Sequence, residues 1–150
     1  MPATSAIVKK IVVGVDGSDA GKSAVEWTAR MAKAMHSQVV AVYALDLPVA
    51  LPDPYAIPFY LDDKWRAGLQ SDFENKWCRP LKTAGVKYRA MIQDGRPASV
   101  LLDVAEREKA ELIVVGKRGR GEVAEFLLGS VSHEVALHSK RPVVLVPRKA

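Results

Sequence analysis

The stretch Gly116–Ser132 reads GKRGRGEVAEFLLGSVS and is the most informative part of the sequence about fold and function. It follows the apolar run Leu112–Val115, whose short length and glycine boundary are typical of a strand buried on both faces. The glycines at positions 116, 119 and 121 allow positive φ and a close approach of the backbone to a ligand. Exposed amides in such a loop can form an anion-binding concavity.

A helical pattern begins at Gly129-Ser130 and continues through Val131, Val135 and Ala136. The first turn of a helix offers unpaired N–H groups and a partial positive charge. A strand, a glycine loop and a helix start in this order therefore indicate a phosphate-binding site. A surface loop without a ligand is the alternative that these residues alone leave open.

Length and composition are those of one globular domain. The chain has 150 residues, of which 49% are hydrophobic and 26% are charged, and this is enough apolar material to build a core. The single cysteine, Cys78, cannot form an intrachain disulfide, which fits a reducing compartment. We find no signal-peptide pattern and no apolar run of membrane-spanning length, so we expect a cytoplasmic protein without a membrane partner.

The basic charge does not indicate a nucleic-acid partner. The formal net charge is +5, but the cations are scattered, no RNA-reading aromatic motif accompanies them, and one cysteine cannot build a zinc finger. The group Lys117-Arg118-Arg120 is the exception, because it lies inside the glycine loop where phosphates are expected.

Apolar runs and helical periodicities alternate along the chain. The expected strands are Lys10–Val15, Gln38–Leu45, Val86–Gln93, Leu112–Val115 and Pro142–Val146. The expected helices follow Gly17-Ser18-Asp19, run from Asp62-Asp63 to just before Gly85, begin at Gly95-Arg96-Pro97, and follow Gly129. This order predicts a parallel α/β sheet with helices on both faces and with ligands beyond the C-terminal ends of its strands.

Two segments resemble nucleotide-binding motifs but do not match them. Gly21-Lys22-Ser23 lacks the first glycine of a P-loop, because Asp16 stands in its place, and it falls inside a helical pattern. Gly119-x-Gly121-x-x-Ala124 imitates a dinucleotide fingerprint but follows the fourth strand rather than the first. Asp16 itself is the best candidate carboxylate: at a strand end it can accept from a ribose hydroxyl or hold a metal, or it can simply cap the following turn.

With these residues in place, the chain resembles the universal stress protein family over nearly its full length. The segments KIVVGVDGS at 10–18, GRPASVLLDVAEREKAELIVVG at 95–116 and RPVVLVP at 141–147 carry the resemblance. Its most specific feature is the spacing Gly116, two residues, Gly119, nine residues, then Gly129-Ser130. This spacing is similar to the glycine signature of the family's ATP-binding branch.

The resemblance implies a Rossmann-like, adenine nucleotide alpha hydrolase-like domain with strand order 3-2-1-4-5, and a homodimer formed through strand 143–146. It implies ATP as the ligand, with the adenine near Gly14, Val15 and Ala44, and with Asp16 facing the ribose or a magnesium ion. The ribose and phosphates would meet Gly116, Lys117, Gly119, Gly129, Ser130, Val131 and Ser132. No catalytic residue is implied.

A nucleotide-dependent stress or regulatory module is therefore the leading functional hypothesis. A slow Mg²⁺-dependent ATPase and a cyclic AMP-binding protein on the same scaffold are the alternatives. The proline-rich loop 46–60 is not part of the family pattern, and either a lid over the site or a role in the dimer is open for it.

Overall fold

The computed structural model describes residues 8–46, 63–118 and 128–149. Five parallel strands form one sheet in the order β3-β2-β1-β4-β5, which confirms the expected strand order. The strands are β1 (Lys10–Gly14), β2 (Gln38–Leu45), β3 (Tyr88–Asp94), β4 (Leu112–Gly116) and β5 (Val143–Val146). The central strand β1 is buried on both sides, with Val12 opposite Val40 of β2 and Ile113 of β4.

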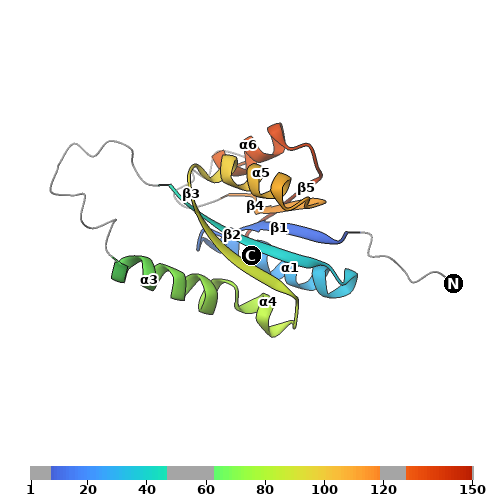
Figure 1. Cartoon of the computed structure of the whole chain (residues 1–150). Coiled ribbons are helices and arrows are strands. Elements are labelled where there is room, and N and C mark those ends of the chain that lie inside the picture. Colours follow the sequence, from blue (N-terminus) through green and yellow to red (C-terminus); the bar gives the residue numbers. More distant parts are fainter. Residues whose placement is uncertain (1–7, 47–62, 119–127, 150) are drawn as a thin grey trace, which may run out of the picture.

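Helices cover both faces of the sheet, as Figure 1 shows. They are α1 (Asp19–Met35), α3 (Asp63–Asp72), the π-helical turn η1 (Phe73–Trp77), α4 (Arg79–Thr83), α5 (Pro97–Arg107) and α6 (Ser130–His138). One apolar core joins α1, η1 and α4 to the sheet through residues such as Val13 and Phe73, and a second joins α5 and α6 through Val12 and Val104. The continuous apolar strands reflect this two-sided burial.

The first helix begins where the turn chemistry predicts. Gly17 has a φ of 78°, a left-handed conformation that glycine adopts readily. The next residue, Ser18, caps α1, because its side-chain oxygen accepts a hydrogen bond from Gly21 N at 3.0 Å. The helix ends at His36, whose φ is 57°. Lys22 and Ser23 lie inside α1, so the region that imitates a P-loop is helix, as expected.

The expected continuous helix from residue 62 to residue 84 is wrong. The chain instead forms α3, widens into η1, and restarts as α4 after Cys78. Pro80 lies in the first turn of α4, where its missing N–H costs nothing, whereas inside one long helix it would remove a hydrogen bond. Gly85 follows α4 with a φ of 72°, as expected of a glycine that ends a helix.

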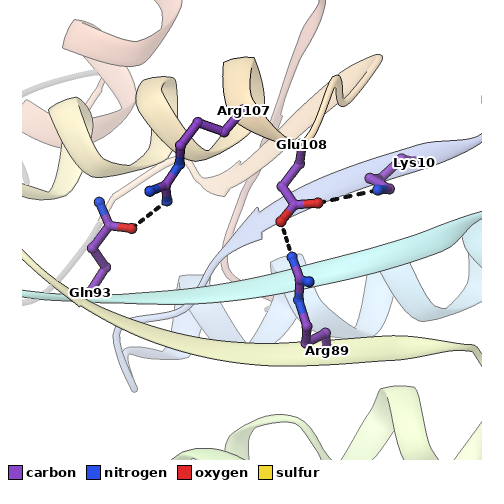
Figure 2. A network of polar contacts seen from close by, with 5 residues as sticks. All are labelled: Lys10, Arg89, Gln93, Arg107 and Glu108. Atoms are coloured by element: carbon purple, nitrogen blue, oxygen red, sulfur yellow. Dashed lines mark hydrogen bonds and ion pairs between the residues drawn. The ribbon is translucent and has the colours of Figure 1, made fainter.

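A polar network fixes the C-terminal end of α5 against the sheet (Figure 2). The carboxylate of Glu108 accepts from Lys10 of β1 at 3.2 Å and also pairs with Arg89 of β3. Arg107 donates to the side chain of Gln93 at 2.6 Å. These contacts hold the far end of α5, so that its first turn, beginning at Pro97, lies beyond the C-terminal ends of the strands.

Candidate functional site

A pocket of about 240 Å³ opens at the C-terminal edge of the sheet, between the ends of β1 and β4. The chain leaves β1 toward β2 and leaves β4 toward β5, so this is the topological switch point at which open α/β sheets bind ligands. The expected site residues that line it are Gly14, Val15, Asp16, Ala44, Gly116, Ser130, Val131 and Ser132. The fold therefore gathers residues from three strands and one helix that are far apart in the sequence.

Part of the pocket lining consists of small or apolar residues. Gly14 and Ala44 lie there together with the buried side chains of Val42 and Leu101. A Cβ atom on Gly14 would lie 3.0 Å from Leu101 Cδ1, so even a methyl group would press on the α5 wall. This part of the lining has the chemistry that suits a flat apolar ring.

Asp16 lines the pocket and also holds the turn that leads to α1. Its Oδ1 accepts from Ser18 N at 2.9 Å and from Ser18 Oγ at 2.6 Å, and Ser18 Oγ accepts in turn from Gly21 N. The capping role anticipated for Asp16 is thus present. It does not exclude a ligand, because a carboxylate has a second oxygen and several acceptor positions.

Hydrogen bonds join the end of β4 to the start of α6. The carbonyl of Lys117 accepts from Gly129 N at 2.9 Å and from Ser132 Oγ at 2.7 Å. Lys117 N donates to Val146 O at 2.7 Å, which ties the same point to β5. Lys117 and Gly129 thus belong to the frame of the site rather than to the pocket lining, and Ser132 belongs to both.

Neither described glycine of this stretch has a positive φ, the conformation that was expected to be open to Gly116. Gly129 is extended, with φ −72° and ψ 166°, a conformation open to any residue. Gly116 also lacks positive φ; a Cβ there would lie 2.8 Å from the Ala20 carbonyl carbon, so its absence allows β4 to approach α1. Gly119 and Gly121 lie outside the described residues.

Several pocket residues were not anticipated as part of the site. Pro97 and Leu101 of α5 and Val42 and Tyr43 of β2 line it. No sequence signal marked these four as site residues, because apolar residues on strands and helices are ordinarily interpreted as core. The half-buried Arg118, one of the glycine-loop cations expected where phosphates lie, also lines the pocket and brings a guanidinium group to it.

A metal at this site would depend on few protein ligands. Among residues 8–46, 63–118 and 128–149, no group of three or more His, Cys, Asp or Glu side chains comes together. Magnesium, however, is commonly held by one or two carboxylates together with substrate phosphates and water. Asp16 therefore suits an ion that arrives with a phosphorylated ligand.

In the same described ranges, no helix is both long and apolar enough to cross a bilayer.

The chain is thus an α/β protein with a parallel sheet, helices on both faces of that sheet, and a pocket at the switch point. The model of the universal stress protein family matches residues 8–147, and the chain belongs to that family. A universal stress protein of Thermus aquaticus is 35% identical over 139 residues, covering 92% of this chain and 98% of the relative.

Solved structures share the fold. The universal stress protein UspA from Lactobacillus plantarum superimposes with a TM-score of 0.78 at 24% identity, covering 92% of this chain and 97% of that chain. A universal stress protein crystallised in complex with cyclic AMP has a TM-score of 0.69 at 29% identity, covering 95% of this chain and 98% of that chain.

Proposed function

We propose that this protein binds an adenine nucleotide, ATP foremost, in the switch-point pocket and works as a nucleotide-dependent regulatory module. The observation that carries the proposal is the mixed lining of the pocket. Small and apolar residues of β1, β2 and α5 line it together with the first turn of α6 and the cation Arg118. A nucleotide likewise combines an apolar base with anionic phosphates.

The base belongs at the apolar part of the lining. Gly14, Val15 and Ala44 lie there with Leu101, and their small or apolar side chains leave room for a flat ring. Burial of an aromatic ring on such a surface contributes roughly 25 cal/mol per Å² of apolar area removed from water. Asp16, which also lines the pocket, would accept a hydrogen bond from a ribose hydroxyl or bind a magnesium ion carried by the phosphates.

The phosphates belong at the start of α6. Ser130, Val131 and Ser132 form its first turn and line the pocket, and the amides of a first turn have no acceptor within their own helix. The helix dipole favours negative charge at the same place. Arg118 supplies a charged donor that can contact a phosphate in two parallel hydrogen bonds. Gly119, which the glycine signature includes, lies outside the described residues.

Cyclic AMP is the second candidate ligand. The relative solved with cyclic AMP is 29% identical and spans 95% of this chain, which gives this alternative a specific basis. The two ligands share the base and the ribose, so in this proposal ATP and cyclic AMP differ mainly in the contacts of their phosphates with the first turn of α6 and with Arg118.

Mass spectrometry of nucleotide released from the purified protein is the first experiment. Calorimetric titration with ATP, ADP, AMP and cyclic AMP, each with and without Mg²⁺, then ranks the candidates. We expect ATP to bind and to turn over more slowly than roughly 1 per second, the lower end of ordinary enzyme rates. Faster Mg²⁺-dependent turnover would favour the ATPase alternative, and preferential binding of cyclic AMP would favour the other.

The same proposal includes a single cytoplasmic domain that forms a homodimer through β5. This strand lies at an edge of the sheet, and Val143, Val144 and Leu145 are only half-buried in the single chain. Apolar edge strands are templates for pairing with another strand. Analytical ultracentrifugation of Val144→Lys tests it: a shift toward monomer supports pairing through β5, and an unchanged dimer places assembly elsewhere.

A further inference from the structure

A groove between α1 and α4 concentrates positive charge on the face of the sheet opposite α5 and α6. Its volume is about 770 Å³. Six cations line it, namely Lys22, Arg30 and Lys33 from α1, Lys76 and Arg79 from η1 and α4, and Lys149 near the C-terminal end. We call these six side chains and the surface between them the cationic groove.

The floor of the cationic groove is apolar. Ala29 is 4% exposed and packs in the core that joins α1 to α4. Pro80 and Ala84 line the groove from the α4 side. Positions 22, 26, 29, 30 and 33 recur at helical spacing, so one stripe of α1 carries both this floor and its cationic rim.

Most of this positive charge is not neutralised inside the protein. Glu26 is the one acidic residue among the described lining residues, and it pairs with Lys149 at 3.0 Å. Lys76 pairs with Asp72 at 3.0 Å. The other four cations, Lys22, Arg30, Lys33 and Arg79, are exposed and form no ion pair with another described residue. Like charges gathered on one surface repel, and an anionic partner relieves this repulsion.

We propose that the cationic groove binds an acidic amphipathic helix of a partner protein. Apolar residues of that helix would lie on Ala29, Pro80 and Ala84, while its carboxylates would face the unneutralised cations on both rims. This is the arrangement by which grooves between helices recognise amphipathic segments. The groove and the switch-point pocket share no lining residue, so this inference does not depend on which nucleotide the pocket binds.

The chemistry of the groove favours a peptide over a nucleic acid. Single-stranded nucleic acids are held by aromatic side chains on which the bases stack, together with cations. None of the described residues that line the groove is aromatic. Trp77, the nearest aromatic residue in the sequence to Lys76, stacks on Tyr43 with a centroid distance of 5.6 Å and is thereby engaged in the core.

Fluorescence anisotropy of a labelled synthetic peptide tests the proposal. The probe is an amphipathic helix of about 16 residues with leucines on one face and glutamates on the other, and its matched control carries glutamine in place of every glutamate. We expect the glutamate peptide to bind in low salt, to bind at least about tenfold more weakly in 0.5 M salt, and the glutamine peptide to bind weakly throughout.

Two variants of equal charge locate the binding surface. The groove variant combines Arg30→Glu and Arg79→Glu, so it reverses one cation on each helix of the groove. The control variant combines Lys87→Glu and Lys140→Glu, so it reverses two exposed cations outside the groove. Each pair lowers the formal net charge from +5 by 4, to +1. We expect the groove variant to lose about tenfold or more in peptide affinity and the control to lose about twofold or less. Both should keep the parent's nucleotide affinity.

Three results would overturn the proposal. One is equal weakening by both variants, which would mean that net charge alone attracts the peptide. Another is failure of the glutamate peptide to bind at low salt while circular dichroism shows the parent folded. The last is tighter binding of a single-stranded oligothymidine than of the peptide, with the same sensitivity to the groove variant, which would assign the groove to nucleic acid.

Discussion

The hydroxyl of Ser132 donates to the carbonyl of Lys117 across 2.7 Å, joining the end of β4 to the first turn of α6. Ser132 is 1% exposed, and its Oγ also lies 3.0 Å from the Gly129 carbonyl. Because a hydroxyl has one proton, it is engaged within this frame and reaches a ligand only as an acceptor. The position of the α6 first turn relative to β4 therefore depends on this contact.

Removal of that hydroxyl should loosen the frame without unfolding the protein. In Ser132→Ala the Lys117 carbonyl keeps its bond from Gly129 N, so we expect a loss of about 0.5–1.5 kcal/mol in the free energy of unfolding. Nucleotide affinity should fall as well. Urea denaturation and nucleotide titration measure both effects, and Ser99→Ala, at an exposed position in α5, is the control. An unchanged unfolding free energy in Ser132→Ala would contradict the structural role given to this bond.

Two substitutions at Asp16 should distinguish its contact with Ser18 from its proposed contact with Mg²⁺. Asp16→Asn keeps an oxygen that can accept from Ser18 but removes the charge, whereas Asp16→Ala removes both. We expect stability within about 0.5 kcal/mol of the parent for Asp16→Asn, and a loss of about 1 kcal/mol for Asp16→Ala, the usual cost of removing such a polar contact. If Asp16 holds Mg²⁺, the stimulation of ATP binding by Mg²⁺ should disappear in both variants. A full Mg²⁺ response in Asp16→Ala would exclude the metal role.

Gly116 should tolerate no side chain. A Cβ there would lie 2.8 Å from the Ala20 carbonyl carbon and 2.9 Å from Gly21 N, both of which are backbone atoms that cannot rotate away. We expect Gly116→Ala to destabilise the protein by about 1–3 kcal/mol. Gly68→Ala is the matched control, because Gly68 lies in α3 with nothing within 4 Å of its added Cβ, and alanine favours a helix. Equal stability of the two variants in thermal unfolding would refute this packing argument.

Stability should decline in alkaline solution because of Cys78. Burial raises the pKa of the Cys78 thiol from 9.0 to about 12, and the charge of Glu74 adds to the effect. Above pH 9 the unfolded chain releases a proton that the folded chain retains, so the free energy of unfolding falls as pH rises from 9 toward 12, by roughly 1 kcal/mol for each pH unit. The pKa of Tyr88 is also raised, chiefly by burial, and acts in the same direction.

The control for this pH effect is Cys78→Ala, which should flatten much of the alkaline decline. Slow labelling of Cys78 by a thiol reagent in the folded parent at pH 8, and fast labelling in urea, would agree with the same burial. A thiol that reacts at the rate of a free cysteine in the folded protein would contradict it.

The parts of the fold that the sequence predicts are those with local signals. The apolar run of β1 and the Ser18 cap of α1 are such signals, and both elements form where expected. The break between α3 and α4 was missed because helical spacing continues through it, and only Pro80 marks the restart. Wall residues such as Leu101 become part of the site because the crossover brings α5 over the strand ends, a relationship that no local pattern encodes.

The hydrogen bonds and close contacts that hold the site together were also not predictable from local sequence patterns. Gly116 was expected to allow an unusual backbone angle, yet it has no positive φ and is required instead for close packing. Ser132 was expected to meet a ligand, and its hydroxyl also donates to a carbonyl 15 residues earlier in the chain, a contact that the spacing did not indicate. Spacing alone cannot distinguish residues that contact a ligand from residues that hold the contacting ones in place.

Calorimetric titration of ATP into Ser130→Asp tests the nucleotide assignment most directly. Ser130 is exposed in the first turn of α6 and lines the pocket, so an aspartate there would suit the helix dipole while repelling phosphates. Ser99→Asp adds the same charge to the first turn of α5, outside the pocket lining. We predict that Ser130→Asp remains folded and binds ATP at least about tenfold more weakly, with a far smaller change in Ser99→Asp. Parent-like ATP affinity in folded Ser130→Asp would show that the phosphates do not lie at α6.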